Sequence, residues 1–180
     1  MWFGFLEETR TISLLISQGL TGFRNVTMTI EPPYVENGRH ATLSCLYELE
    51  GDPLYSVKWY RGTFEFYRYS PSENPPKKIF TYPGFHVDLS YSNATAVFLR
   101  NVGFSLGGNV SCEVTTDAPS FKTRHAKAYL NVVSRPKERP ELHVNKDKYN
   151  VGDILLANCT SFPSKPPAML SFHINNSPIQ

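Results

Sequence analysis

The chain has 180 residues, and 41% of them are hydrophobic, which is enough for a packed core and too many for a disordered chain. No run approaches the about 18 consecutive apolar residues of a membrane-spanning helix, and a formal net charge of +2 argues against a dedicated nucleic-acid binder. With 14 Pro, 11 Gly and 13% aromatic residues, the composition favours short strands joined by turns over an all-helical protein or a coiled coil.

The first 21 residues do not resemble a secretory signal peptide. Such a peptide begins with basic residues followed by an apolar run, whereas here acidic Glu7 and Glu8 follow residues 1–6, and Ser13 interrupts the next apolar run. We expect residues 1–21 to be an atypical segment. Either the natural start of the protein lies upstream, or a truncated or misjoined gene model supplied these residues. Because the chain ends at Gln180 inside an expected strand, we interpret it as a fragment.

Apolar and polar residues alternate with a period of two over much of the chain, which predicts strands. In residues 41–47, Leu43 and Cys45 share one face, and in residues 57–61 Val57 and Trp59 do so. Similar alternation covers residues 94–101, 110–114 and 125–133, and turn-forming residues separate these runs. The pattern predicts an all-β antiparallel sandwich.

Two cysteines and a tryptophan fall on inward positions of three of these strands. Trp59 follows Cys45 by 14 positions, and Cys112 follows Cys45 by 67. This spacing is typical of an immunoglobulin-like domain, in which a disulfide joins strands B and F and a tryptophan on strand C packs against it. It leaves room for strands C′ and C″ and so favours the variable type. The alternative is two unrelated thiols in an intracellular protein.

The run before the second cysteine departs from the variable-type pattern. Val110 stands in the position of the corner tyrosine, and Leu106 in that of an aspartate. We therefore expect the corner hydrogen bond and any ion pair of that aspartate to be missing, which lowers the expected stability.

The domain organisation follows from the remaining pattern. Residues 22–133 are expected to form the variable-type domain, the charged and proline-containing residues 134–140 a linker, and residues 141–180 the truncated start of a second immunoglobulin-like domain. Leu155, Ala157 and Cys159 should face inward there. We expect Cys159 to be unpaired in this fragment, with its partner beyond Gln180; a free reactive or intermolecular thiol is the alternative.

Five N-x-S/T sequons indicate a secreted glycoprotein, found outside the cell or on the extracellular face of the plasma membrane. The predicted acceptors are Asn25, Asn93, Asn109, Asn158 and Asn175. Asn109 should point outward on strand F, where a glycan would cover part of a neighbouring binding face. Asn93 is a safer acceptor, and Asn158, beside a strand cysteine, could stay unmodified.

Long strings of the sequence resemble the Beaten path (Beat) family of insect neuronal proteins. The resemblance is carried by residues 51–62, Gly-Asp-Pro-Leu-Tyr-Ser-Val-Lys-Trp-Tyr-Arg-Gly, and continues in the stretches 65–69, 73–76, 93–95, 99–102, 112–114, 117–121 and 158–161. It extends from about residue 22 to residue 180. Immunoglobulin domains in general share the cysteines and the tryptophan but not these strings.

The resemblance implies a secreted or membrane-anchored protein with two immunoglobulin-like domains that acts in axon guidance and the choice of neuronal partners. Members of the family bind Sidestep-family cell-surface proteins, which are also built of immunoglobulin domains. On this basis the chain is expected to be a heterophilic recognition module, with any lipid anchor or spanning segment in a missing C-terminal region.

The outward residues of strands C and C′ are the candidate binding site, because tyrosine and arginine are enriched at interface hot spots. Alternation places Glu65, Tyr67 and Tyr69 on one face of residues 64–70 and Arg68 on the other. The expected contact residues are Lys58, Tyr60, Glu65, Tyr67, Arg68 and Tyr69. The alternative is that half of these aromatic residues belong to the core.

Other functions are less well supported by the sequence. Homophilic adhesion stays open, as does binding of sulfated glycans or another polyanion to a basic C–C′ face made of Lys58, Arg61, Arg68, Lys77 and Lys78. The five histidines lack metal-ligand spacing, and no nucleophile elbow or phosphate loop is present. We therefore expect no enzyme activity, cofactor, metal, small-molecule substrate or nucleic-acid partner.

Overall fold

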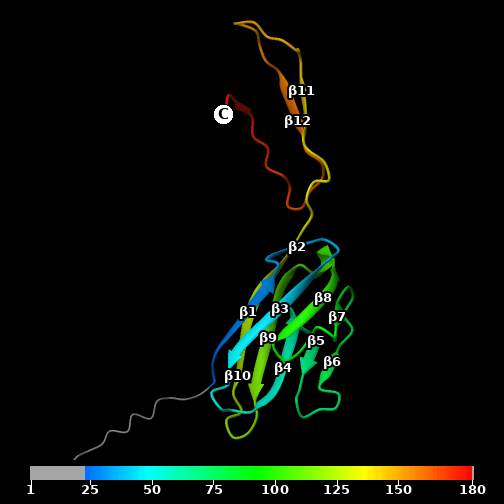
Figure 1. Ribbon diagram of the computed structural model, residues 1–180, viewed down its shortest axis with the longest axis vertical. Coiled ribbons are helices and arrows are strands. Elements are labelled where there is room, and N and C mark those ends of the chain that lie inside the picture. The colour runs from blue at the N-terminus through cyan, green and yellow to red at the C-terminus, as the bar shows by residue number, and fades with distance from the viewer. Residues whose placement is uncertain (1–22, 180) are drawn as a thin grey trace, which may run out of the picture.

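The computed structural model describes residues 23–179 and contains two packed β-sheets, followed by a smaller unit of short strands (Figure 1). The atypical segment predicted for residues 1–21 lies outside the described residues. The four-stranded sheet has the order β1 (Arg24–Glu31), β3 (Arg39–Glu48), β8 (Ala96–Val102), β7 (His86–Asp88). The six-stranded sheet has the order β2 (Tyr34–Glu36), β10 (Thr123–Val133), β9 (Gly108–Thr116), β4 (Leu54–Arg61), β5 (Phe64–Tyr69), β6 (Lys77–Ile79).

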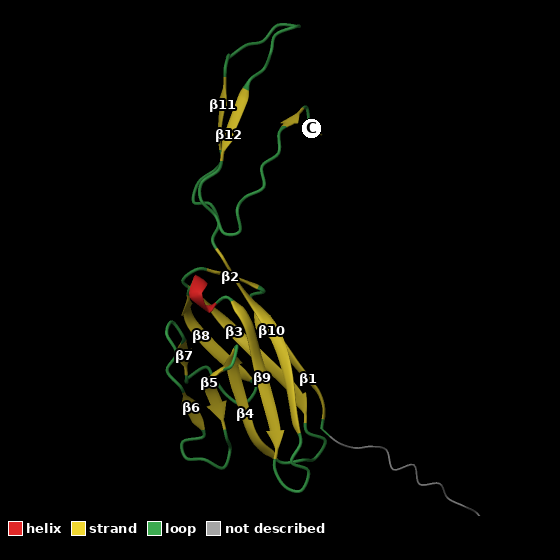
Figure 2. Ribbon diagram, turned by 180° about the vertical axis from the view of Figure 1, so that it is seen from behind, coloured by secondary structure: helices red, strands yellow, loops and turns green. Residues whose placement is uncertain are grey.

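The two sheets lie face to face and enclose one core. The four-stranded sheet is toward the viewer in Figure 1, and β10, β9 and β4 of the other sheet are toward the viewer in Figure 2. On β9, Val110 and Val114 are buried whereas Asn109 is exposed. This alternation arises because successive side chains of a strand point to opposite faces, and each fully buried aliphatic side chain stabilises the fold by about 1.5–3 kcal/mol.

A disulfide joins the two sheets at the centre of this core. Cys45 on β3 is bonded to Cys112 on β9, with their Cα atoms 6.3 Å apart. Trp59 on β4 lies directly opposite Cys112 in the strand register and is 0% exposed. The predicted disulfide is confirmed, and the first unit has the fold of a variable-type immunoglobulin-like sandwich.

Arg61, at the end of β4, holds the turn that precedes β9. The turn contains η1 (Phe104–Leu106), a short 3-10 helix. The guanidinium of Arg61 donates from Nε to the Leu106 carbonyl at 2.9 Å and from Nη2 to the Gly107 carbonyl. Gly108 has a φ of +130°, and a Cβ at this position would lie 2.5 Å from Arg61 Nη2. These carbonyl contacts fix the turn where the sequence lacks the usual aspartate and corner tyrosine.

We expect Arg61→Ala to lower the free energy of unfolding by about 2–3 kcal/mol, because it leaves part-buried carbonyl groups without their charged donor. Arg61→Lys should recover little, since an ammonium group cannot reproduce the planar fork of a guanidinium. Urea unfolding of the variants measures both effects. Arg124→Ala, which removes an exposed arginine that donates to the carbonyl of its neighbour Thr123, is the control. A loss in Arg61→Ala no larger than in this control would contradict the assignment.

The second unit consists of two short two-stranded sheets. They are formed by β11 (Glu141–Val144), β12 (Ala157–Thr160), β13 (His173–Ile174) and β14 (Ser177–Pro178). Leu155 and Ala157 are exposed and Cys159 is half-buried, so the expected inward burial of these residues is not met. Leu155 and Ala157 line a hollow together with His173 and Ile174 of β13, but this contact leaves both residues exposed. Cys159 has no disulfide partner in the part of the chain that the structure describes.

The two units touch where the chain leaves β10. Ser134 and Lys165 exchange two backbone hydrogen bonds of 2.8 and 2.9 Å. The Lys165 ammonium also lies 4.6 Å from the centre of the Phe104 ring, a distance at which cation–π attraction operates. These contacts anchor the second unit to the end of the sandwich that carries η1.

Candidate functional site

The candidate site is the outer face of the middle strands of the six-stranded sheet. Lys58 on β4 lies opposite Glu113 on β9 and opposite Arg68 on β5. Residues directly opposite each other on antiparallel strands share a face, so these three side chains point outward together. We call this surface the β4 face; its residues are Lys58, Tyr60, Glu65, Arg68, Ser111 and Glu113.

A carboxylate at the centre of the β4 face has two partners. Glu113 Oε1 lies 3.5 Å from Lys58 Nζ and accepts a hydrogen bond of 3.5 Å from the Tyr60 hydroxyl. The Lys58 and Glu113 side chains are only 27% and 32% exposed. Burial raises the pKa of Tyr60 to about 12, and the negative charge of Glu113 adds to this rise. Tyr60 is therefore a neutral hydrogen-bond donor at physiological pH.

A second charged pair lies beside the first. Arg68 donates to Glu65 from Nε at 2.7 Å and from Nη2 at 3.0 Å, which is a bidentate arrangement. These hydrogen bonds to Glu65 raise the pKa of Arg68. The guanidinium carbon also lies 5.4 Å from the centre of the Phe80 ring, within cation–π range. Phe80 follows β6 in a loop, and no alternation in the sequence pointed to it.

The expectation that Tyr67 is exposed is wrong. The register pairs Trp59 with Tyr67 but Tyr60 with Glu65, so β5 contributes one extra residue, Phe66, at a β-bulge. The bulge places Tyr67 on the same inward side as Trp59, and its exposed fraction is 0%. Its hydroxyl donates a hydrogen bond of 3.2 Å to the Asn93 carbonyl. Tyr67 belongs to the core.

The same shift moves Tyr69 and Arg68 to faces opposite to those predicted. Tyr69 lies opposite the buried Val57 and is half-buried, so it points inward rather than outward. Arg68 lies outward, on the same face as Glu65 instead of the reverse face. The β4 face therefore has one tyrosine, Tyr60, within a network of paired charges, and not the row of three tyrosines that alternation predicted.

The basic residues proposed for polyanion binding each have a partner within the chain. Lys58, Arg68 and Lys78 form ion pairs with Glu113, Glu65 and Glu73. Arg61 donates to the turn before β9, and Lys77 Nζ donates to the Leu89 carbonyl at 2.9 Å. Carboxylates offset three of the five positive charges, which lowers the net positive field and disfavours a basic C–C′ patch.

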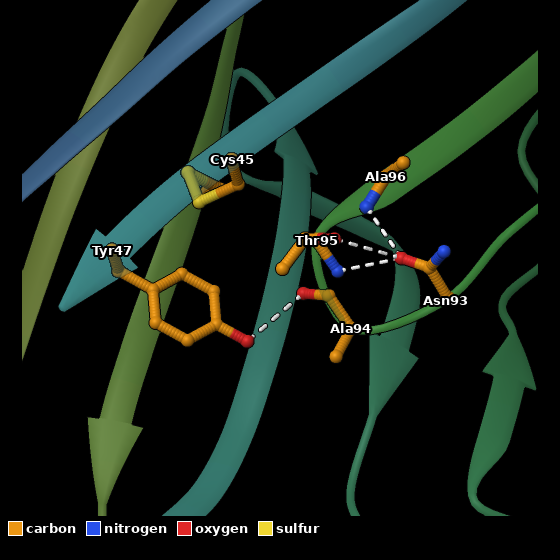
Figure 3. The surroundings of a disulfide bond; sticks show 7 residues. Cys45, Tyr47, Asn93, Ala94, Thr95 and Ala96 are labelled. Atoms are coloured by element: carbon orange, nitrogen blue, oxygen red, sulfur yellow. Dashed lines mark hydrogen bonds between the residues drawn. A yellow bond between two sulfur atoms is a disulfide. The ribbon is translucent and has the colours of Figure 1, made fainter. Parts of the chain in front are cut away.

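All five predicted glycosylation acceptors are exposed. Asn109 lies beside Tyr129 on the outer side of β9 and β10, beyond the Arg61 end of the β4 face. The amide oxygen of Asn93 accepts hydrogen bonds from the backbone amides of Thr95 and Ala96, at 2.8 and 2.9 Å, and from the Thr95 hydroxyl at 3.1 Å (Figure 3). Attachment of a glycan at these sites stays a prediction.

Buried tyrosines predict an alkaline loss of stability. Burial raises the pKa of both Tyr47 and Tyr67 to about 12, whereas the pKa of tyrosine in an unfolded chain is about 10. Between these values the unfolded chain releases protons that the folded chain retains, so the free energy of unfolding is highest below pH 10 and falls as pH rises toward 12. Figure 3 shows Tyr47 close to Cys45, with its hydroxyl bonded to the Ala94 carbonyl at 3.3 Å.

Urea unfolding at several pH values from 8 upward measures this loss. Tyr67→Phe should flatten the fall of stability above pH 10, because it removes one of the raised groups. An unfolding free energy that does not change between pH 8 and the alkaline limit would contradict the assignment.

Residues 23–179 contain no group of three or more His, Cys, Asp or Glu side chains placed to hold a metal ion. Within the same residues, no helix has the length and apolar character needed to cross a membrane.

No protein family and no curated protein sequence matches the chain. Among solved structures, murine CEACAM1b is similar, with a TM-score of 0.67 and 19% identity over 87% of this chain and 76% of that chain. A structure of a mouse coronavirus receptor-binding domain complexed with its murine receptor also matches, with a TM-score of 0.59 and 19% identity over 76% of this chain and 67% of that chain. At this identity the likeness shows the fold alone.

Proposed function

We propose that the chain is an extracellular recognition module that binds a cell-surface protein through the β4 face. The observation that carries this proposal is the network of part-buried charges on that face: Glu113 with Lys58 and Tyr60, and Glu65 with Arg68. Side chains that are already held in place lose little further freedom on binding, which leaves more of the contact energy for affinity.

The pattern of charge supports a protein partner over a uniform polyanion. The β4 face carries charges of both signs: Lys58 lies between Glu113 and Arg68, and Arg68 is paired with Glu65. A partner with the complementary pattern is selected, and one with like charges in the same places is rejected. A polyanion would meet repulsion from two carboxylates on this surface.

We further propose that the partner is a Sidestep-family protein, bound heterophilically, and that the chain acts in axon guidance or the choice of neuronal partners. The long strings that resemble the Beat family support this, residues 51–62 above all. The disulfide and the five sequons support a secreted or cell-surface location.

Binding of the secreted chain to a panel of Sidestep-family ectodomains and to itself tests the partner. We expect selective binding to one or two ectodomains that persists from low to physiological salt, because paired charges inside an interface are less screened than exposed ones. Self-association without ectodomain binding would favour homophilic adhesion. Binding to every ectodomain that disappears with salt would favour a polyanion-type surface; either result would overturn the proposal.

A further inference from the structure

A hollow on the opposite sheet has the composition of a ligand site. It is lined mainly by residues of β3 and β8, which belong to the sheet opposite the β4 face. Figure 1 shows these two strands side by side. The residues that line it are Gly38, Arg39, His40, Tyr91, Phe98, Arg100 and Asn101. Its volume is about 430 Å³, which falls in the range of small-ligand sites.

Three neighbouring rings form the floor of this hollow. The Phe98 ring is stacked on the His40 ring, with ring centres 5.4 Å apart. The centre of the Phe98 ring also lies 5.5 Å from the centre of the Tyr91 ring. Tyr91 is 66% exposed, so a ligand can reach the face of its ring. The face of an aromatic ring carries partial negative charge and packs well against the polarised C–H groups of a sugar ring.

Two guanidinium groups stand beside the rings, and no carboxylate lines the hollow. The Arg39 side chain is exposed and has no hydrogen bond or ion pair with any described residue. Arg100 is oriented by an ion pair with Asp88 and stays 63% exposed. A guanidinium bonds carboxylate or sulfate oxygens in a bidentate manner, so this rim attracts an anionic group.

We propose that this hollow binds an acidic sugar. The sugar ring packs on Tyr91 and Phe98, and its sulfate or carboxylate group pairs with Arg39 and Arg100. An acidic peptide would satisfy the guanidinium groups but would leave the flat, exposed ring surface without a matching flat ligand. This second binding activity is independent of protein recognition by the β4 face, since it uses the other sheet.

Titration of the chain with a heparin-derived octasaccharide, sialyllactose and neutral lactose tests the proposal. We expect at least one acidic sugar to bind and lactose not to bind. Sialyllactose carries a carboxylate only, whereas the octasaccharide carries sulfates and carboxylates, so binding of sialyllactose would show that a carboxylate is sufficient. Arg39→Ala and Tyr91→Ala should each weaken binding by about tenfold. Their matched controls on the other sheet, Lys127→Ala and Tyr129→Ala (Tyr129 is 59% exposed), should change it by less than about twofold.

Three results would overturn the proposal. The first is no binding of either acidic sugar. The second is equal weakening by Arg39→Ala and Lys127→Ala, which would show diffuse attraction to surface charge. The third is binding of a short polyglutamate peptide with the same affinity as the sugar, which would show that the hollow binds acidic protein segments. Unfolding curves of all four variants establish that the fold is retained.

Discussion

Replacing Cys45 and Cys112 together by alanine is expected to lower the free energy of unfolding by about 4 kcal/mol. The bond closes a loop of 67 residues, and closing a loop of this length removes much of the freedom of the unfolded chain. The two sulfurs are also fully buried beside Trp59, so their removal leaves a small cavity in the centre of the core.

Urea unfolding of the double variant and the unchanged chain measures this loss. Domains of this size have a total stability of about 5–15 kcal/mol, so the variant should unfold at much lower denaturant. Cys159→Ala is the matched control, because Cys159 is half-buried and lies outside the disulfide. Equal effects of the double variant and of this control would contradict the central role of the bond.

Tyr67→Ala is expected to lower the free energy of unfolding by about 3–5 kcal/mol, as for other large aromatic residues truncated in a core. Tyr67 is 0% exposed, lies opposite Trp59, and donates a hydrogen bond to the Asn93 carbonyl. Tyr67→Phe keeps the ring and loses only that hydrogen bond, so its cost should be about 1 kcal/mol. Any loss of partner binding in Tyr67→Ala would therefore reflect unfolding, and not a lost contact.

Thermal or urea unfolding separates these two variants. Tyr129→Ala serves as the control, because Tyr129 is a strand tyrosine of the same sheet that is 59% exposed. We expect its effect to be within about 0.5 kcal/mol of zero. If Tyr67→Ala and Tyr129→Ala had similar small effects, the inward placement of Tyr67 would be wrong.

The fold could be predicted because two independent patterns agree. The period-two alternation in β3 and β9 reports one buried and one open face. Cys45, Trp59 and Cys112 then fall on the buried faces at a spacing typical of one fold class. Alternation alone would have predicted only strands, and the spacing alone would not have shown that these three residues are buried.

The register around Tyr67 could not be predicted from alternation. A β-bulge adds a residue to one strand only, and every later side chain changes face. In most strands the polar residues would reveal such a shift. Residues 64–69 carry aromatic side chains at four of six positions, so both phases of the alternation are equally apolar, and only pairing with β4 decides between them.

The pairing at the centre of the β4 face, by contrast, could have been predicted from the sequence. Once Trp59 and Cys112 are placed opposite each other on antiparallel strands, the next pair outward is Lys58 with Glu113. This pair and the neighbouring Tyr60 make up the central network. The contacts of Arg61 with the turn carbonyls and of Arg68 with Phe80 depend on loop geometry, which strand patterns do not encode.

The most direct test of recognition through the β4 face is the affinity of Tyr60→Ala and of Tyr91→Ala for the proposed partner, a Sidestep-family ectodomain. Tyr60 lies at the centre of the β4 face, and Tyr91 is an exposed tyrosine of the opposite sheet. We predict that Tyr60→Ala weakens binding by roughly 30-fold, the size of a hot-spot loss of about 2 kcal/mol, and that Tyr91→Ala weakens it by less than about twofold. An unchanged affinity in Tyr60→Ala, or a larger loss in Tyr91→Ala, would contradict recognition through the β4 face.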